Sequence, residues 1–154
     1  MPIRRALLFA LLAITISTPA LAARDDIMGR WLTHKGGEIE IAPCTSQPEK
    51  LCGFIASLVN PERTPTDAEN PDPALRDRPL LGLPLFFDFI YAGEDKWKEG
   101  RIYNVENGKT YNSKLRLLAQ DQLKLSGCVL FFCKSYTWHR TTETDTPANR
   151  TSNP

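Results

Sequence analysis

The sequence is built from short apolar or alternating runs separated by turn-forming residues, and no long stretch has the 3.6-residue period of an amphipathic helix. Alternation of apolar and polar side chains every second residue is typical of half-buried strands. Most connections between the runs are a few residues long, as in antiparallel meanders. The pattern predicts eight strands, at residues 28–33, 38–43, 51–59, 85–91, 96–104, 110–118, 122–127 and 130–140.

The connection between the third and fourth strands, Asn60–Pro84, is the long exception and is rich in Pro, Asp, Glu and Asn. Asp72 is suited to cap a helix and Pro73 to its first position, so a helical turn or two is expected at 74–78, before Pro79. The run LLGL at 80–83 then needs an apolar surface to cover. We expect this segment to lie as a lid or plug across one end of the sheet.

The run WKEGRIYNVENGKTYNSKL at 97–115 predicts a β-hairpin that turns at Asn107-Gly108, because both residues tolerate a positive φ. A two-residue loop would pair Ile102 with Ser113 and Asn104 with Tyr111, whereas a three-residue loop with a glycine bulge would mix inner and outer side chains. The two-residue loop is therefore favoured. It places on the inner face Ile102, Tyr111, Ser113, Leu115 and Leu117, and on the outer face Arg101, Tyr103, Asn112, Lys114 and Arg116.

Eight short antiparallel strands must protect their edges, and closing the sheet does so completely. We therefore predict an all-β fold, an antiparallel up-and-down barrel of about eight strands with a short helical turn in the long connection. The interior of such a barrel is wide enough either to be filled by side chains or to hold one small ligand. A split sandwich is the alternative architecture.

The N-terminus carries two arginines at positions 4 and 5, an apolar run at 6–15 and the small-x-small sequence Ala20-Leu21-Ala22. These features predict a cleaved signal peptide at 1–22, since the apolar run is too short for a spanning helix. The expected mature protein is one domain at 23–140 and a disordered tail at 141–154, periplasmic or secreted, with no stable membrane anchor. Loss of the two arginines takes the formal net charge from +1 to about −1, which argues against nucleic-acid binding.

The four cysteines, Cys44, Cys52, Cys128 and Cys133, form an even set in a chain that is expected to be exported, which indicates disulfides. Three pairings are possible in principle. The local one, Cys44–Cys52 and Cys128–Cys133, suits a hairpin-rich chain best. A zinc site is disfavoured by the spacings C-x7-C and C-x4-C, so no metal or cofactor is expected.

Several segments together resemble the domain of unknown function 2147 family of exported bacterial proteins. They are GRW at 29–31, IEIAPC leading to LCGFI at 39–55, NPDPALRDRPLLGL at 70–83, WKEGRIYNVENGKTY at 97–111 and YTWHR at 136–140. The resemblance spans essentially the whole domain and implies a lipocalin-like or calycin-like barrel of the bacterial envelope, with no known activity. The glycine-x-tryptophan also resembles the lipocalin element whose tryptophan closes one barrel end, a role that would fall on Trp31.

No catalytic constellation is recognisable, so we expect a protein that is not an enzyme. His34 and His139 lie outside any nucleophile motif and are expected at the surface. Asp88, within LFFDFIY, is either a candidate acid or base, or an outward residue that meets an arginine, and the second is favoured. A hydrolase is the third-ranked function.

Two functions remain open. One is a carrier or sensor that binds a small apolar or amphipathic ligand in a pocket lined by Trp31, Tyr111 and Trp138. There Arg78 would bind a ligand carboxylate at the mouth, although for Arg76 and Arg78 a structural role, fastening the plug to Asp77, Asp88 or a strand-end carbonyl, is favoured. The other is a protein-interaction or stress-related module of the envelope with a filled barrel and no ligand. An empty apolar volume of several hundred Å³ would favour the carrier.

Overall fold

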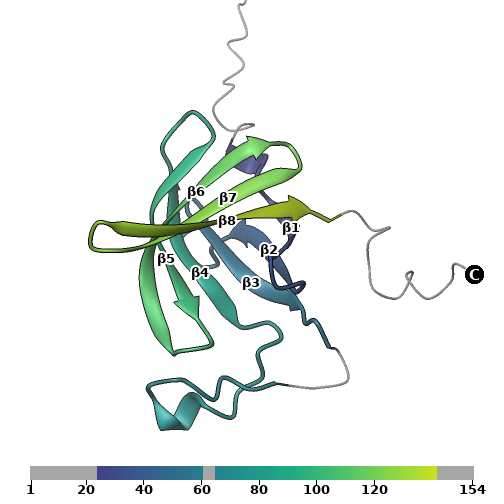
Figure 1. Ribbon diagram of the computed structural model, residues 1–154. Helices are drawn as coiled ribbons and strands as arrows, with labels where there is room; N and C mark the ends of the chain where they lie inside the picture. The colour runs from purple at the N-terminus through teal and green to yellow at the C-terminus, as the bar shows by residue number, and fades with distance from the viewer. Residues whose placement is uncertain (1–23, 61–64, 142–154) are drawn as a thin grey trace, which may run out of the picture.

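The computed structural model describes residues 24–60 and 65–141, which form a closed barrel of antiparallel strands in sequence order (Figure 1). The strands pair with their neighbours along the chain, and β1 pairs with β8 through Trp31–Arg140 and Leu32–His139, which closes the barrel. The eight strands are β1 (Gly29–Leu32), β2 (Glu38–Pro43), β3 (Leu51–Ser57), β4 (Pro84–Tyr91), β5 (Lys96–Asn104), β6 (Lys109–Ala119), β7 (Gln122–Val129) and β8 (Phe132–Arg140).

The up-and-down barrel predicted from the alternation is therefore confirmed, in preference to the sandwich. The expected signal peptide and the tail beyond residue 141 lie outside the described residues. In the part of the chain that the structure describes, no helix is long and apolar enough to cross a membrane.

The β5–β6 hairpin differs in register from the prediction. Its loop has four residues, Val105 to Gly108, and Asn104 pairs with Lys109 and Ile102 with Tyr111. The longer turn is stabilised by its asparagines: the Asn104 side chain accepts a hydrogen bond from the backbone N–H of Glu106 at 2.9 Å, as asparagine does in Asx turns. The slip of two residues preserves the alternation of faces; of the predicted outer set only Tyr103 is buried, by contacts with the long connection.

Aromatic side chains fill one half of the barrel, which we call the closed half. Trp31, Trp97, Phe86 and Phe89 are all completely buried there. The ring of Phe89, on β4, lies over Gly100 of the adjacent strand β5. A Cβ at that glycine would be 2.2 Å from the ring. The glycine is thus required for the ring to enter the core.

Trp31 belongs to this filled half and lies at its end. Its indole Nε1 donates a hydrogen bond to the carbonyl oxygen of Ile27 at 2.8 Å. The Arg140 guanidinium covers the ring at 4.3 Å from its centroid and donates to the carbonyl oxygen of Met28 at 2.6 Å. These contacts seal the barrel where the chain enters β1.

The long connection contains a 3-10 helix, η1 (Pro73–Leu75), which is shorter and tighter than the expected helical turn. Asp72 caps it as predicted, by accepting a hydrogen bond from the Ala74 N–H at 3.0 Å. Of the LLGL run only Leu83 is fully buried, whereas Leu81 is exposed. In Figure 1 the connection lies at the end of the barrel opposite the β4–β5 and β6–β7 turns.

Both predicted disulfides are present, Cys44–Cys52 in the β2–β3 turn and Cys128–Cys133 near the β7–β8 turn. Disulfides are typical of proteins in oxidising compartments outside the cytosol.

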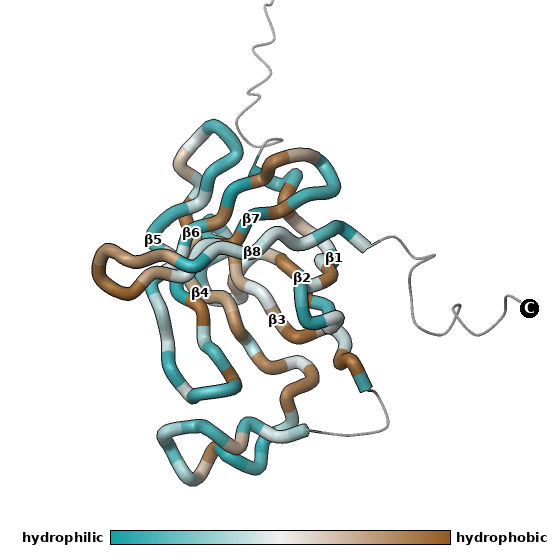
Figure 2. The backbone as a smooth tube through the Cα atoms, viewed as in Figure 1, coloured by the Kyte–Doolittle hydropathy of each residue, from teal (hydrophilic) through white to brown (hydrophobic). Residues whose placement is uncertain are grey.

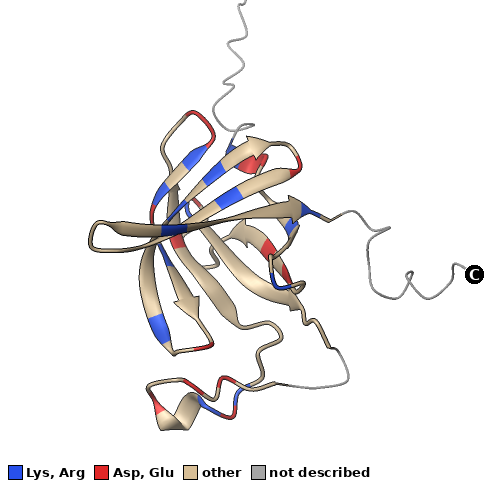
Figure 3. Cartoon of the chain, viewed as in Figure 1, with Lys and Arg blue, Asp and Glu red and all other residues tan. Residues whose placement is uncertain are grey.

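The β7–β8 turn is a projecting apolar loop, brown in Figure 2. Basic side chains are spread along β6, β7 and β8, as the blue segments in Figure 3 show.

Candidate functional site

The other half of the barrel, which we call the open half, contains a solvent-connected cavity of about 740 Å³. Its wall is formed by inward-facing side chains of the strands, and its rim by the β1–β2, β5–β6 and β7–β8 turns and the ends of the long connection. The apolar part of the wall includes Ile39, Ile55, Leu80, Leu85, Ile102, Leu125 and Trp138. A cavity of this size is within the range of small-molecule sites, roughly 300–1,000 Å³.

Trp138 marks the boundary between the cavity and the filled half. Its ring stacks on Phe86, with centroids 5.5 Å apart and planes inclined by 8°. Its Nε1 donates a long hydrogen bond of 3.4 Å to Nδ1 of His34, a residue of the β1–β2 turn. An indole in the wall, with its N–H already partnered, leaves mainly apolar surface for a ligand.

The rim carries charged and aromatic groups. His34 stacks on Tyr136 at 3.8 Å between centroids, and the Lys134 ammonium lies 5.2 Å from the Tyr136 centroid. Lys35 donates a hydrogen bond to the carboxylate of Glu106, so this ion pair joins the β1–β2 and β5–β6 turns. The hydrogen bond and charge of Lys35 lower the pKa of Glu106, which keeps the pair ionised at neutral pH.

The pKa of His34 is affected by burial and by the charged side chains of this rim. Partial burial lowers the pKa of His34, and the positive charges of Lys35 and Lys134 lower it further against the opposing effect of Glu106. The imidazole is therefore neutral at pH 7, which agrees with Nδ1 as the acceptor for Trp138. Two ammonium groups near the imidazole make this side of the rim favourable for a negative charge.

The structure brings together two of the four residues predicted to bind a ligand. Tyr111 and Trp138 both line the cavity. Trp31 faces the interior but lies in the closed half, beneath Arg140, and is not among the residues that line this cavity. Arg78 also lies away from the cavity wall, because its guanidinium is bound elsewhere.

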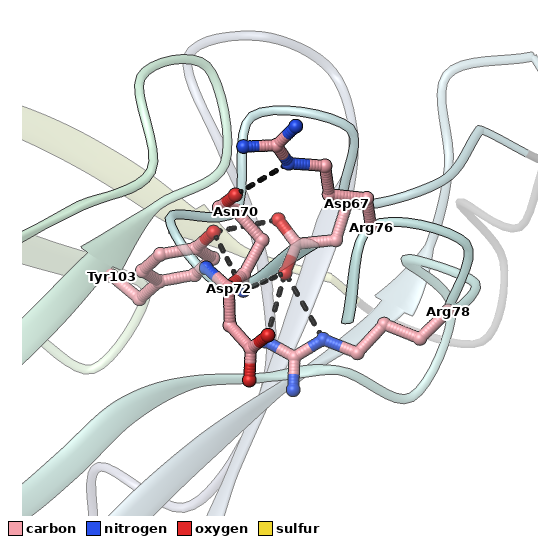
Figure 4. Close-up of polar contacts among 6 residues, drawn as sticks. All are labelled: Asp67, Asn70, Asp72, Arg76, Arg78 and Tyr103. Atoms are coloured by element: carbon pink, nitrogen blue, oxygen red, sulfur yellow. Dashed lines mark hydrogen bonds and ion pairs between the residues drawn. The ribbon is translucent and has the colours of Figure 1, made fainter. Parts of the chain in front are cut away.

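Arg78 belongs to a buried polar cluster that fastens the long connection to β5 (Figure 4). Its Nε and Nη2 donate to Oδ2 of Asp67 at 3.0 and 2.8 Å, and the Tyr103 hydroxyl donates to Oδ1 at 2.7 Å. The amide of Asn70 donates to Oδ2 at 2.7 Å, and Arg76 binds the carbonyl oxygen of Asn70 at 2.8 Å. None of the partners considered for these arginines is the observed one: Arg78 binds Asp67 and Arg76 binds Asn70, both within the connection, and the Tyr103 hydroxyl joins the cluster to β5.

Asp67 is completely buried, and its surroundings favour the carboxylate. Burial acts to raise the pKa of Asp67, but the hydrogen bonds from Tyr103, Asn70 and Arg78, together with the charge of Arg78, outweigh it and lower the pKa. Burial and the bond to Asp67 raise the pKa of Tyr103. The donors of Arg78, Tyr103 and Asn70 converge on the ionised, internal carboxylate of Asp67, so the cluster holds the fold rather than presenting a free anion site.

Asp88, the other acidic residue singled out in the sequence, pairs with Arg101 at 2.9 Å. Both side chains are more than a third exposed, so the outward placement is confirmed. Within the described ranges, 24–60 and 65–141, no group of three or more His, Cys, Asp or Glu side chains is arranged to hold a metal ion.

The rim residues His34, Lys35 and Lys134 are those that the sequence did not single out as ligand-facing. His34 and Lys35 lie in the β1–β2 turn, where no two-residue period indicates direction. Lys134, in contrast, has the same parity on β8 as Tyr136 and Trp138, so the alternation of that strand could have indicated its direction. Ile39, Ile55 and Leu125 likewise lie on alternating strands whose inward positions give a usable signal.

The model of one protein family matches residues 29–140, and that family is described as "Uncharacterized protein conserved in bacteria (DUF2147)". The match covers all eight strands. The comparison with curated proteins found no match.

Among solved structures, the chain is similar to protein HP1028 of the human pathogen Helicobacter pylori, which is described as belonging to the lipocalin family. The TM-score is 0.71 at 23% identity, covering 80% of this chain and 88% of that one. A redesigned β-barrel also matches, with a TM-score of 0.46 and 16% identity over 78% of this chain and 96% of the design. The first of these similarities supports a lipocalin-like barrel fold.

Proposed function

The chain belongs to the bacterial family DUF2147, whose members are uncharacterised, and from this premise we propose that it is an exported carrier or sensor that holds one small amphipathic ligand in its barrel. The open cavity of about 740 Å³ is the observation that carries the proposal. A barrel that served only as a rigid module has no need of such a volume, since eight strands can be filled by side chains.

The chemistry of the wall favours a ligand with an apolar body. Inward side chains such as Ile55, Ile102 and Leu125 are aliphatic, and the Trp138 ring, stacked on Phe86, adds aromatic surface to the wall. Burial of an apolar chain against this surface is worth about 25 cal/mol per Å² of area removed from water. An acyl or similar hydrocarbon chain is the type of group that gains most from such a wall.

The chemistry of the rim favours an acidic head group. Lys35, which pairs with Glu106, and Lys134 place ammonium groups near His34, and their charge adds to the effect of burial in lowering the pKa of His34. A carboxylate or phosphate bound there would supply the missing negative charge and would raise the pKa of His34. Tyr111, whose hydroxyl accepts a hydrogen bond from the Asn107 amide at 2.9 Å, offers a further polar group in the wall.

An extracytoplasmic location supports a carrier role. Two disulfides use all four cysteines of the chain, and such bonds persist in oxidising compartments such as the bacterial periplasm. The signal peptide expected at 1–22 accounts for the route. Detection of a processed N-terminus in the periplasmic fraction, by intact-mass measurement, tests this part of the proposal separately.

Ligand binding is tested by titration with a fluorescent fatty acid, displaced by unlabelled acids and by alcohols of equal chain length. Ile102→Trp places a large ring in the cavity and should weaken binding at least tenfold. Ile90→Trp makes the same exchange at an exposed strand position outside the cavity, and should leave binding unchanged. Absence of saturable binding to the whole panel would reject the carrier and leave the protein-interaction module as the better account.

The head-group assignment has its own test. Lys134→Ala should weaken binding of the acid several-fold and that of the matching alcohol little, because only the acid carries a charge. Equal losses for both ligands would mean that Lys134 contributes to the shape of the rim and not to recognition of an anion.

A further inference from the structure

We propose that the apolar tip of the β7–β8 hairpin, Val129 to Phe132, docks the open end of the barrel on an anionic lipid surface. The tip is the part of the described surface where large apolar side chains are most exposed. The exposed fractions are 55% for Val129, 89% for Leu130, 95% for Phe131 and 84% for Phe132. Four adjacent residues of this kind form a continuous patch, unlike the isolated apolar residues that soluble proteins commonly expose.

The requirements of the turn do not explain these residues. Val129 pairs with Phe132, so Leu130 and Phe131 are the two central residues of a tight hairpin turn. Such turns favour Asn or Gly, and Leu130 has a φ of 53°, a region that disfavours a leucine. The sequence thus places apolar side chains where the backbone would be more stable with small or polar ones, and the adjacent Cys128–Cys133 disulfide holds the hairpin closed.

The charge around the tip complements an anionic membrane. The three strands β6, β7 and β8 contain no Asp or Glu. Of their basic residues Lys109, Lys114 and Lys134 lie in the halves of the strands nearer the tip, whereas Arg116, Lys124 and Arg140 lie toward the other end of the barrel. Lys134 follows the disulfide directly, and Lys114 is paired across β6–β7 with Ser126, three residues before the tip. Apolar side chains that project beyond a basic surface are the combination by which peripheral proteins bind anionic lipids.

The shape of the tip favours a lipid surface over a protein partner. The patch is confined to one narrow loop (Figure 2), and four side chains are too few for a stable protein interface, which buries about 1,200 Å² or more. A bilayer accepts a small convex wedge without needing a matching pocket.

The tip also has a fixed relation to the cavity. Val129 and Phe132 belong to the cavity lining as well as to the tip, whereas Leu130 and Phe131 belong to the tip alone. Docking by the tip would therefore bring the mouth of the barrel to the membrane. The docking inference does not depend on whether the cavity holds a ligand.

The test is flotation of the purified full-length mature protein with vesicles of phosphatidylcholine, with and without phosphatidylglycerol. We expect binding to the anionic vesicles that weakens as salt is raised. The double variant Leu130→Ser/Phe131→Ser should reduce this binding at least about tenfold, while Lys114→Ala should reduce it by roughly fivefold on anionic vesicles only. Leu118→Ser, at an exposed apolar position on β6 beyond Leu117, is the matched control and should bind normally.

A spectroscopic variant reports insertion directly. The three native tryptophans, Trp31, Trp97 and Trp138, are buried, so in Phe131→Trp the emission from a solvent-exposed indole comes from the tip. Its emission should shift to the blue when anionic vesicles are added. An unshifted spectrum with no flotation of the parent protein would overturn the proposal, and so would equal loss of binding in Leu118→Ser. Concentration-dependent dimerisation without vesicles, abolished by Phe131→Ser, would show instead that the tip contacts a second copy.

Unchanged fatty-acid affinity in Leu130→Ser/Phe131→Ser would separate the two proposals, because these side chains lie outside the cavity lining. Loss of vesicle binding with retained ligand binding supports the docking inference. Vesicle binding without any ligand binding rejects the carrier and leaves the docking inference intact.

Discussion

Asp67→Asn should destabilise the protein by about 2 kcal/mol at pH 7. The substitution keeps the shape of the side chain but removes the charge that accepts two hydrogen bonds from Arg78 and one each from Tyr103 and Asn70. Breaking a fully buried ion pair costs about 3–5 kcal/mol. A lower value is expected here because the Arg78 side chain is 35% exposed and regains water, and because an asparagine oxygen still accepts in part.

Asp88→Asn is the matched control. It removes the charge from another Asp–Arg pair of nearly equal length, 2.9 Å, in which both side chains are well exposed. Exposed pairs contribute about 0.2–1 kcal/mol. Asparagine also tolerates the φ of 62° at this position, so no backbone strain is added. Urea unfolding at pH 7, with the two variants and the parent analysed at a common m-value, gives the comparison.

The destabilisation caused by Asp67→Asn should also depend on pH. Because the folded-state pKa of Asp67 is lowered, its stabilisation is fully present above the unfolded pKa of about 4 and is lost as the pH falls through the folded value. The stability difference between parent and Asp67→Asn should therefore shrink below about pH 4. A destabilisation no larger than that of Asp88→Asn, or a difference that stays constant into the acid range, would refute the assignment of Asp67 as a buried, ionised fastener.

Three further predictions concern other parts of the barrel. Trp31→Phe should cost about 1–2 kcal/mol more than Trp97→Phe in urea unfolding, since Nε1 of Trp31 donates to Ile27 whereas that of Trp97 has no partner among the described residues; equal costs would contradict this. Gly108→Val should lower the melting temperature clearly, because φ is +66° and a Cβ would lie 1.9 Å from the Glu69 carbonyl oxygen; coincident melts would reject the turn assignment. Stability should fall as the pH drops below about 6.5 because the fold resists protonation of His34, and His34→Gln should flatten that part of the urea-midpoint profile; an unchanged slope would exclude His34 as its source.

Alternation along the strands was sufficient to predict the barrel and the faces of its side chains. Tyr111 and Trp138 were correctly expected to point into the cavity, because a period of two residues specifies the face. The same period is insensitive to a slip of two residues, which is why Ile102 was paired with Ser113 instead of Tyr111. Register at that turn depends on the hydrogen bonds of Asn104, which no hydrophobic pattern contains.

The alternation of apolar and polar residues does not indicate how far along the barrel axis a side chain lies, or which distant segments contact each other. Trp31 faces inward as expected, but alternation does not tell the filled half from the open half. Tyr103 was assigned to the outer face, yet it is buried, because Asp67 and Asn70 cover it from the long connection. Such a partnership joins residues more than thirty positions apart and depends on the path of that connection.

The short seam between β1 and β8 has a mechanical consequence. Backbone pairing joins the two strands at Trp31–Arg140 and Leu32–His139, near the closed end. Nearer the mouth, the wall is bridged by side chains, the stacking of His34 on Tyr136 and its long hydrogen bond from Trp138. Widening of the barrel mouth on this side would therefore separate stacked rings and one long side-chain hydrogen bond, and would break no ladder of backbone hydrogen bonds.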